Sequence, residues 1–579
     1  MKSARSVGKR SARYTVGIDF GTLSGRAVLV DVDTGEEVAT AVHEYEHGVI
    51  EEHLPGSRRR LRPDTALQDP ADYLRVLELT IPRILRQAGV RPAQVVGVGT
   101  DFTSCTLLPT RADGRPLCFD RRWRGNPHAW VKLWKHHAAQ PEAHRITALA
   151  RERREQFISA YGGRYSSEWF FAKVLETVNQ APAVYDAAER FIEAGDWIVW
   201  MLCGKERRCV SAAGFKAMWV CPSAAAEADT PSEPVRAWTY PDPPFFRALH
   251  PKLEHVVRDK LTSSMWPLGT RAGGLTAHMA RRVGLLPGTP VATGNIDAHV
   301  AVPACRVTTP GKLVMIMGTS TCHLVLSESR RVVEGACGVV RDGVVPGYWG
   351  YEAGQAGVGD LFAWFAANGV PAAAAAEARR AGLDVFAWLE QQAAGLRPGE
   401  SGLLALDWWA GCRSVLMDSD LNGLLVGATV ATRPHEIYRA LMEATAFGTR
   451  KIIEAFNTQG VAIDELYACG GLALKSPLLM QLYADITGRT IRLARSEQTC
   501  ALGAAMQAAV AAGVYRDIHS AARKMAHLRP GLLKPNPAHK AVYDELYAEY
   551  NRLHDLFGRD PASVMKVLKR LRLRALGVT

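Results

Sequence analysis

The 579-residue sequence lacks any uninterrupted run of 18 or more apolar residues, so it contains no candidate for a membrane-spanning helix and we expect no membrane partner. It also lacks C-x-x-C pairs, because its 11 cysteines are scattered singly, several of them within apolar stretches. This spacing favours buried free thiols over disulfides or a cysteine-bound metal. The first 13 residues are basic but lead into no apolar secretory segment, which predicts a disordered basic tail on a cytoplasmic protein.

Positive charge is in moderate excess, because the sequence has 70 Lys and Arg residues and 58 Asp and Glu residues, which gives a net charge of +12. The basic residues are mostly spread along the chain without interleaved aromatic residues, which argues against a nucleic-acid partner and favours small anionic ligands. A hydrophobic content of 47% is that of a globular protein, and the length predicts two or more domains.

Two copies of one short pattern organise the chain. The stretch from Tyr14 to Asp31 reads as two apolar strands joined by a turn of small residues, with Asp19 beside the turn. Such a turn lets backbone N–H groups approach a phosphate closely, although a plain tight hairpin explains a single copy equally well. The stretch from Leu313 to Ser329 repeats the pattern, with Gly318 and Thr319 in the places of Gly21 and Thr22. The repeat predicts a duplicated chain.

The segments around each hairpin alternate between strand and helix patterns, which predicts an α/β fold. In the first copy we expect a strand at 36–43, a helix at 70–88 and a buried strand at 95–108. In the second we expect strands near 338–340 and at 465–469 and a helix at 433–456. The two resulting lobes are expected to enclose a central cleft. The first lobe carries an insertion at about 120–282, in which 126–137 and 161–176 read as helices and 224–244 as a loop.

A candidate general base lies just before the second hairpin. The segment Pro290–Cys305 reads as a strand, a Gly-Asn break and a helix that begins near Asp297. Helix capping is the simplest role for a carboxylate at that position. Its place beside the second phosphate-binding turn also suits a base that takes the proton of a substrate hydroxyl during phosphoryl transfer.

Several motifs together carry a family resemblance that runs from about Tyr14 to about Tyr550. The combination of DFGT at 19–22, GNID at 294–297, GTST at 318–321 and Gly470-Gly471 resembles the FGGY family of sugar kinases, which share the actin-like ATPase (ribonuclease H-like) fold. Further motifs, including YGGRYSSEW, AGFKAMW and GYEAGQAGVGDLFAWF, are similar to the ribulokinase branch of that family.

The resemblance implies roles for individual residues. Asp297 would be the general base and also contact the sugar, and Asp19 would position Mg²⁺ on ATP. The ATP phosphates and adenosine would be bound by Gly21, Thr22, Gly318, Thr319, Ser320, Gly470, Gly471 and Leu472. The sugar would be bound by Ser104, Lys216 and Glu352.

The implied domains are a tail at 1–13, a first kinase lobe at 14–302, a second, nucleotide-binding lobe at 303–550 and a helical tail at 551–579. The implied reaction is the ATP-dependent phosphorylation of L-ribulose to L-ribulose 5-phosphate in arabinose catabolism. Alternatives within the fold are a kinase for xylulose, ribitol or another polyol, and a nucleotide-dependent chaperone or filament protein. A sugar sensor without catalysis would be expected to have lost Asp19 or Asp297, and both are present. The sequence leaves the oligomeric state open, a homodimer included.

Overall fold

The computed structural model describes residues 12–220, 239–261, 264–560 and 562–575. The chain forms two compact units. Unit 1 consists of Met1–Arg153, Tyr165–Arg306 and Cys500–Ala526, and unit 2 of Arg154–Arg164, Val307–Thr499 and His527–Thr579. Most of the expected tail at 1–13 and most of the expected loop at 224–244 lie outside the described residues. No helix in the described ranges is both long and apolar enough to cross a membrane.

The central sheet of unit 1 confirms the first predicted hairpin. Strands β1 and β2 pair antiparallel, β2 pairs antiparallel with β3, and β1 pairs in parallel with β5. The sheet order is β11-β12-β5-β1-β2-β3, and β13 also pairs with β5. Its strands are β1 (Tyr14–Phe20), β2 (Ser24–Asp31), β3 (Glu37–Glu44), β5 (Val95–Phe102), β11 (Arg271–Gly274), β12 (Pro290–Ala292) and β13 (Asn295–Ile296).

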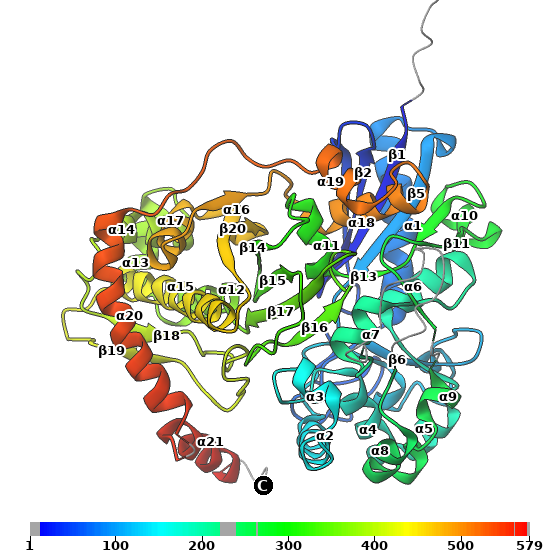
Figure 1. The fold of residues 1–579 in the computed structure, drawn as a ribbon, viewed down its shortest axis with the longest axis horizontal. Coiled ribbons are helices and arrows are strands. Elements are labelled where there is room, and N and C mark those ends of the chain that lie inside the picture. The colour runs from blue at the N-terminus through cyan, green and yellow to red at the C-terminus, as the bar shows by residue number, and fades with distance from the viewer. Residues whose placement is uncertain (1–11, 221–238, 262–263, 561, 576–579) are drawn as a thin grey trace, which may run out of the picture. The chain divides into compact units, whose positions relative to one another are not determined.

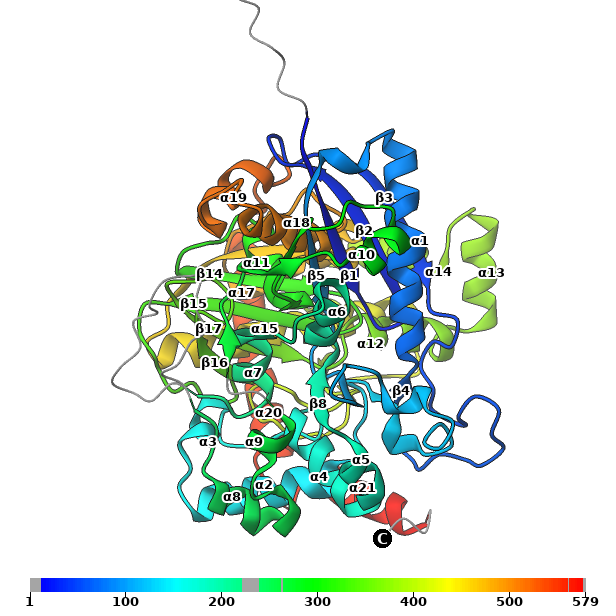
Figure 2. The same ribbon diagram turned by 90° about the vertical axis from the view of Figure 1, so that its right-hand side faces the viewer.

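Helix α1 (Pro70–Ala88) has the predicted bounds because both of its ends are capped. The Asp69 side chain accepts a hydrogen bond from the Ala71 backbone N–H, and Gly89 ends the helix in the left-handed conformation, φ 63°. Its apolar face packs on β2 and β3 (Figure 2).

Helix α18 (Thr499–Ala511) explains why a segment near the end of the chain belongs to unit 1. It lies along β1 and β5 (Figure 1), and a Cβ atom on Gly17 would stand 1.8 Å from the Ala501 carbonyl oxygen. A Cβ atom on Gly99 would stand 2.0 Å from the Ala504 carbonyl oxygen. The glycines therefore allow the helix to approach the sheet closely.

The insertion of unit 1 differs from three sequence-based expectations. The expected helix at 126–137 is wrong, because Val131–Lys132 form strand β7 and pair with β4 and β6. The expected helix at 161–176 begins only at Phe170, since Gly162 and Gly163 turn the chain with positive φ. The expected strand at 95–108 is two strands, because the chain turns at Cys105 (φ 61°) and enters a second sheet.

That second sheet has the order β4-β7-β6-β8, with β4 (Leu67–Gln68), β6 (Leu107–Thr110), β7 (Val131–Lys132) and β8 (Arg190–Glu193). The short strands β9 (Arg208–Cys209) and β10 (Met265–Trp266) pair with each other. The remaining helices of unit 1 are α2 (Gln140–Glu152), α4 (Phe170–Gln180), α5 (Pro182–Ala187), α6 (Ala194–Cys203), α7 (Val210–Lys216), α8 (Pro243–Leu249), α9 (Val256–Lys260), α10 (Ala277–Val283), α11 (Asp297–Ala304) and α19 (Ile518–Met525).

Unit 2 repeats the strand order of unit 1, with one correction. Its sheet runs β16-β17-β15-β14-β20-β21, so β17 and not β16 takes the place that β3 has in unit 1. The expected third strand at 338–340 is therefore the edge strand, which pairs with β17 rather than with the hairpin. The strands are β14 (Gly311–Met317), β15 (Thr321–Ser327), β16 (Gly338–Arg341), β17 (Trp349–Gln355), β20 (Ile463–Cys469) and β21 (Ile491–Leu493).

The predicted long helix of unit 2 is confirmed as α15 (Pro434–Thr458), which packs on α17 and on the sheet. A small hairpin is formed by β18 (Leu404–Leu406) and β19 (Leu424–Val426). The other helices are α3 (Gln156–Ala160), α12 (Gly359–Asn368), α13 (Ala372–Arg380), α14 (Val385–Ala394), α16 (Gly471–Lys475), α17 (Pro477–Thr487), α20 (Pro537–Gly558) and α21 (Val564–Ala575).

Candidate active site

Three neighbouring strands of unit 1 carry polar side chains at one level of the sheet. Asp19 on β1 is in register with Asp101 on β5, and Asp101 is in register with Asn295 on β13. All three strands are parallel, so the polar positions come to the same edge. Helix α11 begins directly after β13 with Asp297. The register therefore places Asp101 between the two carboxylates that the sequence singled out.

Asp101 was not singled out in the sequence, yet it is the most buried carboxyl of this group. It has no exposed surface, and among the described residues only the Asp19 carboxyl is close enough to share a hydrogen bond with it, when one of the two is protonated. Burial raises the pKa of Asp101 well above its usual range, and the charges of Asp19 and Asp297 raise it further. The one available signal was a lone carboxylate within an otherwise apolar strand.

The first turn is held by side chains around it. The Asp19 carboxylate lies 3.5 Å from the Arg26 Nε atom. The Gly21 N–H donates to the Ser24 carbonyl at 3.0 Å, and Tyr45 donates to the Gly21 carbonyl at 2.9 Å.

Thr22 in the same turn accepts two further hydrogen bonds. Its carbonyl accepts one from the Gln68 side chain at 2.7 Å, and its hydroxyl accepts one from the Trp134 indole N–H at 3.1 Å. Four hydrogen bonds and the Asp19–Arg26 ion pair therefore hold the turn.

Asp297 and Lys216 belong to two helices of unit 1 that are tied together. Ser211 on α7 is hydrogen-bonded to His299 on α11, with 2.8 Å between Oγ and Nδ1, and the Phe215 ring packs edge-on against the same histidine. Asp297 is half-buried, and its carboxylate accepts a hydrogen bond from the Ala298 N–H at 2.7 Å. Lys216 ends α7 and is buried. The local framework thus fixes both predicted residues relative to each other.

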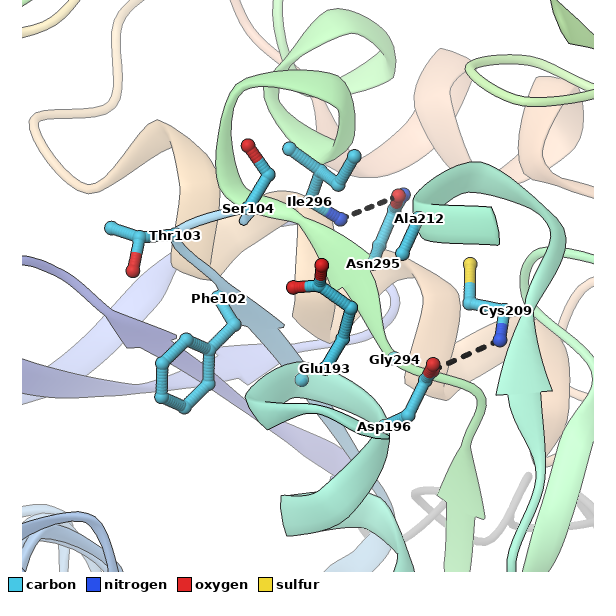
Figure 3. Close-up of a pocket in the computed structure, with 11 residues that line it drawn as sticks. Phe102, Thr103, Ser104, Glu193, Asp196, Cys209, Ala212, Gly294, Asn295 and Ile296 are labelled. Carbon is cyan, nitrogen blue, oxygen red and sulfur yellow. Dashed lines mark hydrogen bonds between the residues drawn. The ribbon is translucent and has the colours of Figure 1, made fainter. Parts of the chain in front are cut away.

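Ser104 lines a cavity of unit 1 (Figure 3). It lies in the turn between β5 and β6. The lining residues also include Asn295 and Glu193, neither of which the sequence assigned a role. The charge of Lys216 opposes the rise in the pKa of Glu193 that burial causes, so the two side chains lie within electrostatic reach of each other. The structure therefore gathers Ser104, Lys216 and two further polar side chains in one region.

The predicted nucleotide residues of unit 2 come together at the adjacent ends of β14 and β20. A Cβ atom on Gly470 (φ 91°) would stand 2.4 Å from the Met317 carbonyl oxygen, so this glycine packs directly beside the turn at Gly318. The N–H groups of Gly359 and Asp360, at the start of α12, donate to the carbonyls of Gly318 and Thr319.

The remaining residues of this group follow from the same arrangement. Ser320 closes the turn, since its carbonyl accepts from the Gly318 N–H at 2.9 Å. Gly471 and Leu472 follow as the first turn of α16. Glu352 is buried on β17, opposite Leu324 of β15 in the ladder. Unit 2 therefore presents two glycine turns side by side, an arrangement in which backbone N–H groups can approach phosphate oxygens.

The comparisons with known proteins decide what these two units belong to. Residues 313–512 match the model of the FGGY family of carbohydrate kinases, C-terminal domain. The ribulokinase of Geobacillus thermodenitrificans is 54% identical over 561 residues, which cover 96% of this chain and 97% of that protein. The chain belongs to the FGGY family of carbohydrate kinases. The ribulokinase of Mycolicibacterium smegmatis is 48% identical over 97% of this chain and 96% of its own length.

Solved kinase structures confirm the fold of this family member. The xylulose kinase of Rhodospirillum rubrum aligns with a TM-score of 0.73 over 94% of this chain and 98% of its own, at 22% sequence identity. The glycerol kinase of Plasmodium falciparum, solved with ADP, aligns with a TM-score of 0.69 over 94% and 98%, at 14% identity. The predicted α/β fold with two kinase lobes is confirmed. As an FGGY member, the chain is an ATP-dependent carbohydrate kinase.

Proposed function

We propose that this FGGY kinase phosphorylates L-ribulose at its C5 hydroxyl, giving L-ribulose 5-phosphate for arabinose catabolism. The observation that carries the proposal is the 48–54% identity to ribulokinases over nearly the whole length of both chains. The identity to the xylulose and glycerol kinases compared above is 22% and 14%. The whole chain therefore resembles ribulokinases far more than it resembles these two kinases.

In the proposed reaction, Asp297 takes the proton of the C5 hydroxyl. The freed oxygen attacks the γ-phosphorus of ATP, the bond from that phosphorus to the bridging oxygen breaks, and ADP leaves. Three features of unit 1 support this role. Asp297 begins a helix, its carboxylate is half-buried, and α11 is tied to the helix that carries Lys216. Ser104, Lys216 and, from unit 2, Glu352 are proposed to bind the remaining sugar hydroxyls.

The two glycine turns of unit 2 are proposed to bind the nucleotide. Gly318, Thr319 and Ser320 would contact the phosphates, while Gly470, Gly471 and Leu472 would pack near the adenosine. The close packing of Gly470 on Met317 supports this division, because any side chain at Gly470 would collide with the strand end beside the phosphate turn. Gly21 and Thr22 would supply the equivalent turn from unit 1.

A magnesium ion that accompanies ATP fits the residues present. No group of three or more His, Cys, Asp or Glu side chains in the described residues forms a complete metal site. Magnesium bound to a nucleotide needs only one or two protein carboxylates, because phosphate and water oxygens supply its other ligands. Asp19 lies at the base of the first phosphate turn and can be that carboxylate. When bound, the ion would neutralise charge on the transferred phosphoryl group.

A coupled assay of ADP release across ketopentoses, ketohexoses and pentitols tests the proposed substrate. We expect the highest kcat/KM for L-ribulose. A higher kcat/KM for xylulose, ribitol or another polyol would assign the chain to that substrate instead. Because the reaction consumes ATP and forms an anionic sugar phosphate, we also propose that the enzyme works in the cytoplasm.

We propose that the enzyme is a homodimer that forms through α21. Val564, Leu568 and Leu571 on this helix are 51%, 57% and 47% exposed, and they recur at helical spacing on one face. Exposed acidic residues (Asp555 and Asp560) precede the helix, and exposed arginines (Arg570, Arg572 and Arg574) lie at its end. A twofold axis lets the two copies of α21 pack antiparallel. This arrangement would bring the acidic residues of one copy close to the arginines of the other.

Light scattering after gel filtration tests the dimer. We expect twice the chain mass for the wild type and a monomer for Leu568→Glu. Val430→Glu, at a fully exposed loop position, serves as the control and should leave the mass unchanged. A monomeric wild type would rule the dimer out.

A further inference from the structure

Glu193 lies where the insertion meets the sugar-side turn of unit 1. It is the last residue of β8, and its partner in the ladder is Leu107 at the start of β6. The turn that precedes β6 carries Ser104. The pairing of β6 with β8 therefore brings Glu193 and Ser104 into one cavity, although they are far apart in the sequence. Glu193 is only 6% exposed.

Only one of the two carboxylate oxygens of Glu193 is used by the protein. Its Oε2 atom accepts a hydrogen bond from the Thr106 N–H at 3.0 Å, which anchors the side chain. Its Oε1 atom is buried and meets no donor among the described residues. In Figure 3 the carboxylate points into the space bounded by Phe102, Ser104 and Ile296. The cavity thus contains a free acceptor that is fixed in direction.

Asn295 contributes a free donor to the same cavity. Its side-chain oxygen accepts from the Ile296 N–H at 2.8 Å, which fixes the orientation of the amide. Its Nδ2 group is buried and meets no acceptor in the described part of the chain. A hydroxyl group both donates and accepts one hydrogen bond, so a polyhydroxylated ligand offers the complement of this pair.

The charge around Glu193 is balanced without use of its free oxygen. Lys173 is fully buried nearby, but its ammonium group donates to the backbone carbonyls of Leu133 at 2.7 Å and of Cys105 at 2.5 Å. Burial raises the pKa of Glu193, whereas Lys173, the Thr106 N–H and Lys216 lower it again. A carboxylate that served packing alone would be expected to engage both oxygens, because a buried polar atom without a partner destabilises the folded state.

We infer that Glu193 and Asn295 bind hydroxyl groups of the acceptor sugar, and that these two side chains select which polyols the enzyme accepts. The inference rests on the proposed function, because it assumes that a sugar enters the cavity at Ser104. It adds two specificity-determining residues to the side chains for which the family resemblance implies contact with the sugar.

Glu193→Gln tests the inference with the least change in shape. The glutamine can still accept the Thr106 N–H, but it presents an N–H₂ donor where the free acceptor was. We expect KM for the preferred sugar to rise about 10- to 100-fold, with kcat within about threefold and KM for ATP unchanged, because a hydrogen bond to a charged group is lost on binding. Asn295→Asp replaces the free donor by an acceptor and should also raise KM for the preferred sugar. This variant tests the inference independently if Glu193→Gln folds poorly.

Glu142→Gln is the matched control. Glu142 is also 6% exposed in unit 1, but it lies outside the cavity and accepts a hydrogen bond from Asn179 at 3.1 Å. This variant should leave KM for every sugar unchanged. Equal thermal unfolding of Glu193→Gln and the control would show that the effect on KM is not a folding defect.

Deoxy analogues of the sugar identify the hydroxyl that is bound. The analogue without that hydroxyl should have the same KM with the wild type and with Glu193→Gln, whereas the other analogues should keep the difference. An unchanged KM for all sugars in Glu193→Gln, or a parallel loss of ATP affinity and thermal stability, would overturn the inference. If the wild type prefers a polyol other than ribulose, the proposed substrate is wrong, and the same comparison with that polyol still tests Glu193.

Discussion

Asp101→Asn should make the enzyme more stable, and the gain should grow with pH. The substitution removes a fully buried carboxyl whose neighbours include two other carboxyls, Asp19 and Asp297, and whose charge is only partly offset by Arg26. Asparagine has the same shape but cannot ionise. In the unfolded chain the carboxyl of Asp101 has its usual pKa of 3.8, whereas in the folded protein burial and its neighbours raise that pKa well above this value.

The sign of the pH dependence follows from proton binding. Above pH 3.8 the unfolded chain loses the proton of Asp101 while the folded protein retains it, so the folded state binds more protons. The free energy of unfolding of the wild type therefore falls by about 1.4 kcal/mol per pH unit from this group, until the pH reaches the folded pKa. The variant has no such contribution. The difference between its free energy of unfolding and that of the wild type therefore increases at that rate with pH, and becomes constant above the folded pKa of Asp101.

Urea unfolding of both proteins at several pH values between 5 and 8 measures this difference. Asp464→Asn, at an exposed aspartate of unit 2, is the control and should follow the wild type at every pH. A constant difference between Asp101→Asn and the wild type across this range would refute the reasoning, because it would mean that Asp101 is ionised in the folded protein. A variant that becomes less stable than the wild type as the pH rises would refute it as well.

Three further predictions concern the reaction. Asp297→Asn should fold normally and lose roughly 10²- to 10⁴-fold in kcat, as expected for the loss of a general base, and turnover near the wild-type rate would place the base elsewhere. Asp19→Ala should raise the Mg²⁺ concentration needed for turnover and leave sugar affinity by calorimetry largely intact, so an equal loss of sugar affinity would indicate a structural role. Lys216→Ala should lower kcat/KM for ribulose by roughly 10- to several hundred-fold in steady-state assays, because a buried polar contact to the sugar is lost. An unchanged kcat/KM would remove Lys216 from the sugar site.

The parts of the fold that the sequence predicted well are those that short-range signals determine. The first hairpin follows from two apolar runs around a turn of small residues. Helix α1 follows from its amphipathic pattern, and it ends at Gly89 because a left-handed residue terminates it. The second hairpin was found through the repeated Gly-Thr turn. Strand β7, by contrast, is two residues long and exists because β4 and β6 pair with it, so no pattern within 126–137 indicates it. Likewise, β17 takes the third place in the unit 2 sheet because of long-range pairing with β15.

The candidate site divides in the same way. The glycine turns and Asp297 lie in compact motifs that a sequence displays directly. Asp101 and Glu193 were missed because strand pairing places each of them in the site. Asp101 pairs with Asp19 of β1, and Glu193 pairs with the strand that follows Ser104. A carboxylate inside an apolar strand is a usable signal for both, but the strand register is needed to say which residues it meets.

The reaction that we propose for this chain is the transfer of the γ-phosphoryl group of ATP to the C5 oxygen of L-ribulose. Nuclear magnetic resonance of the product formed from L-ribulose and ATP, with ADP measured in the same sample, tests it most directly. We expect one ADP for each sugar phosphate, and a three-bond phosphorus coupling to the protons on C5. Phosphate attached to another carbon, or ADP formed without any sugar phosphate, would contradict it.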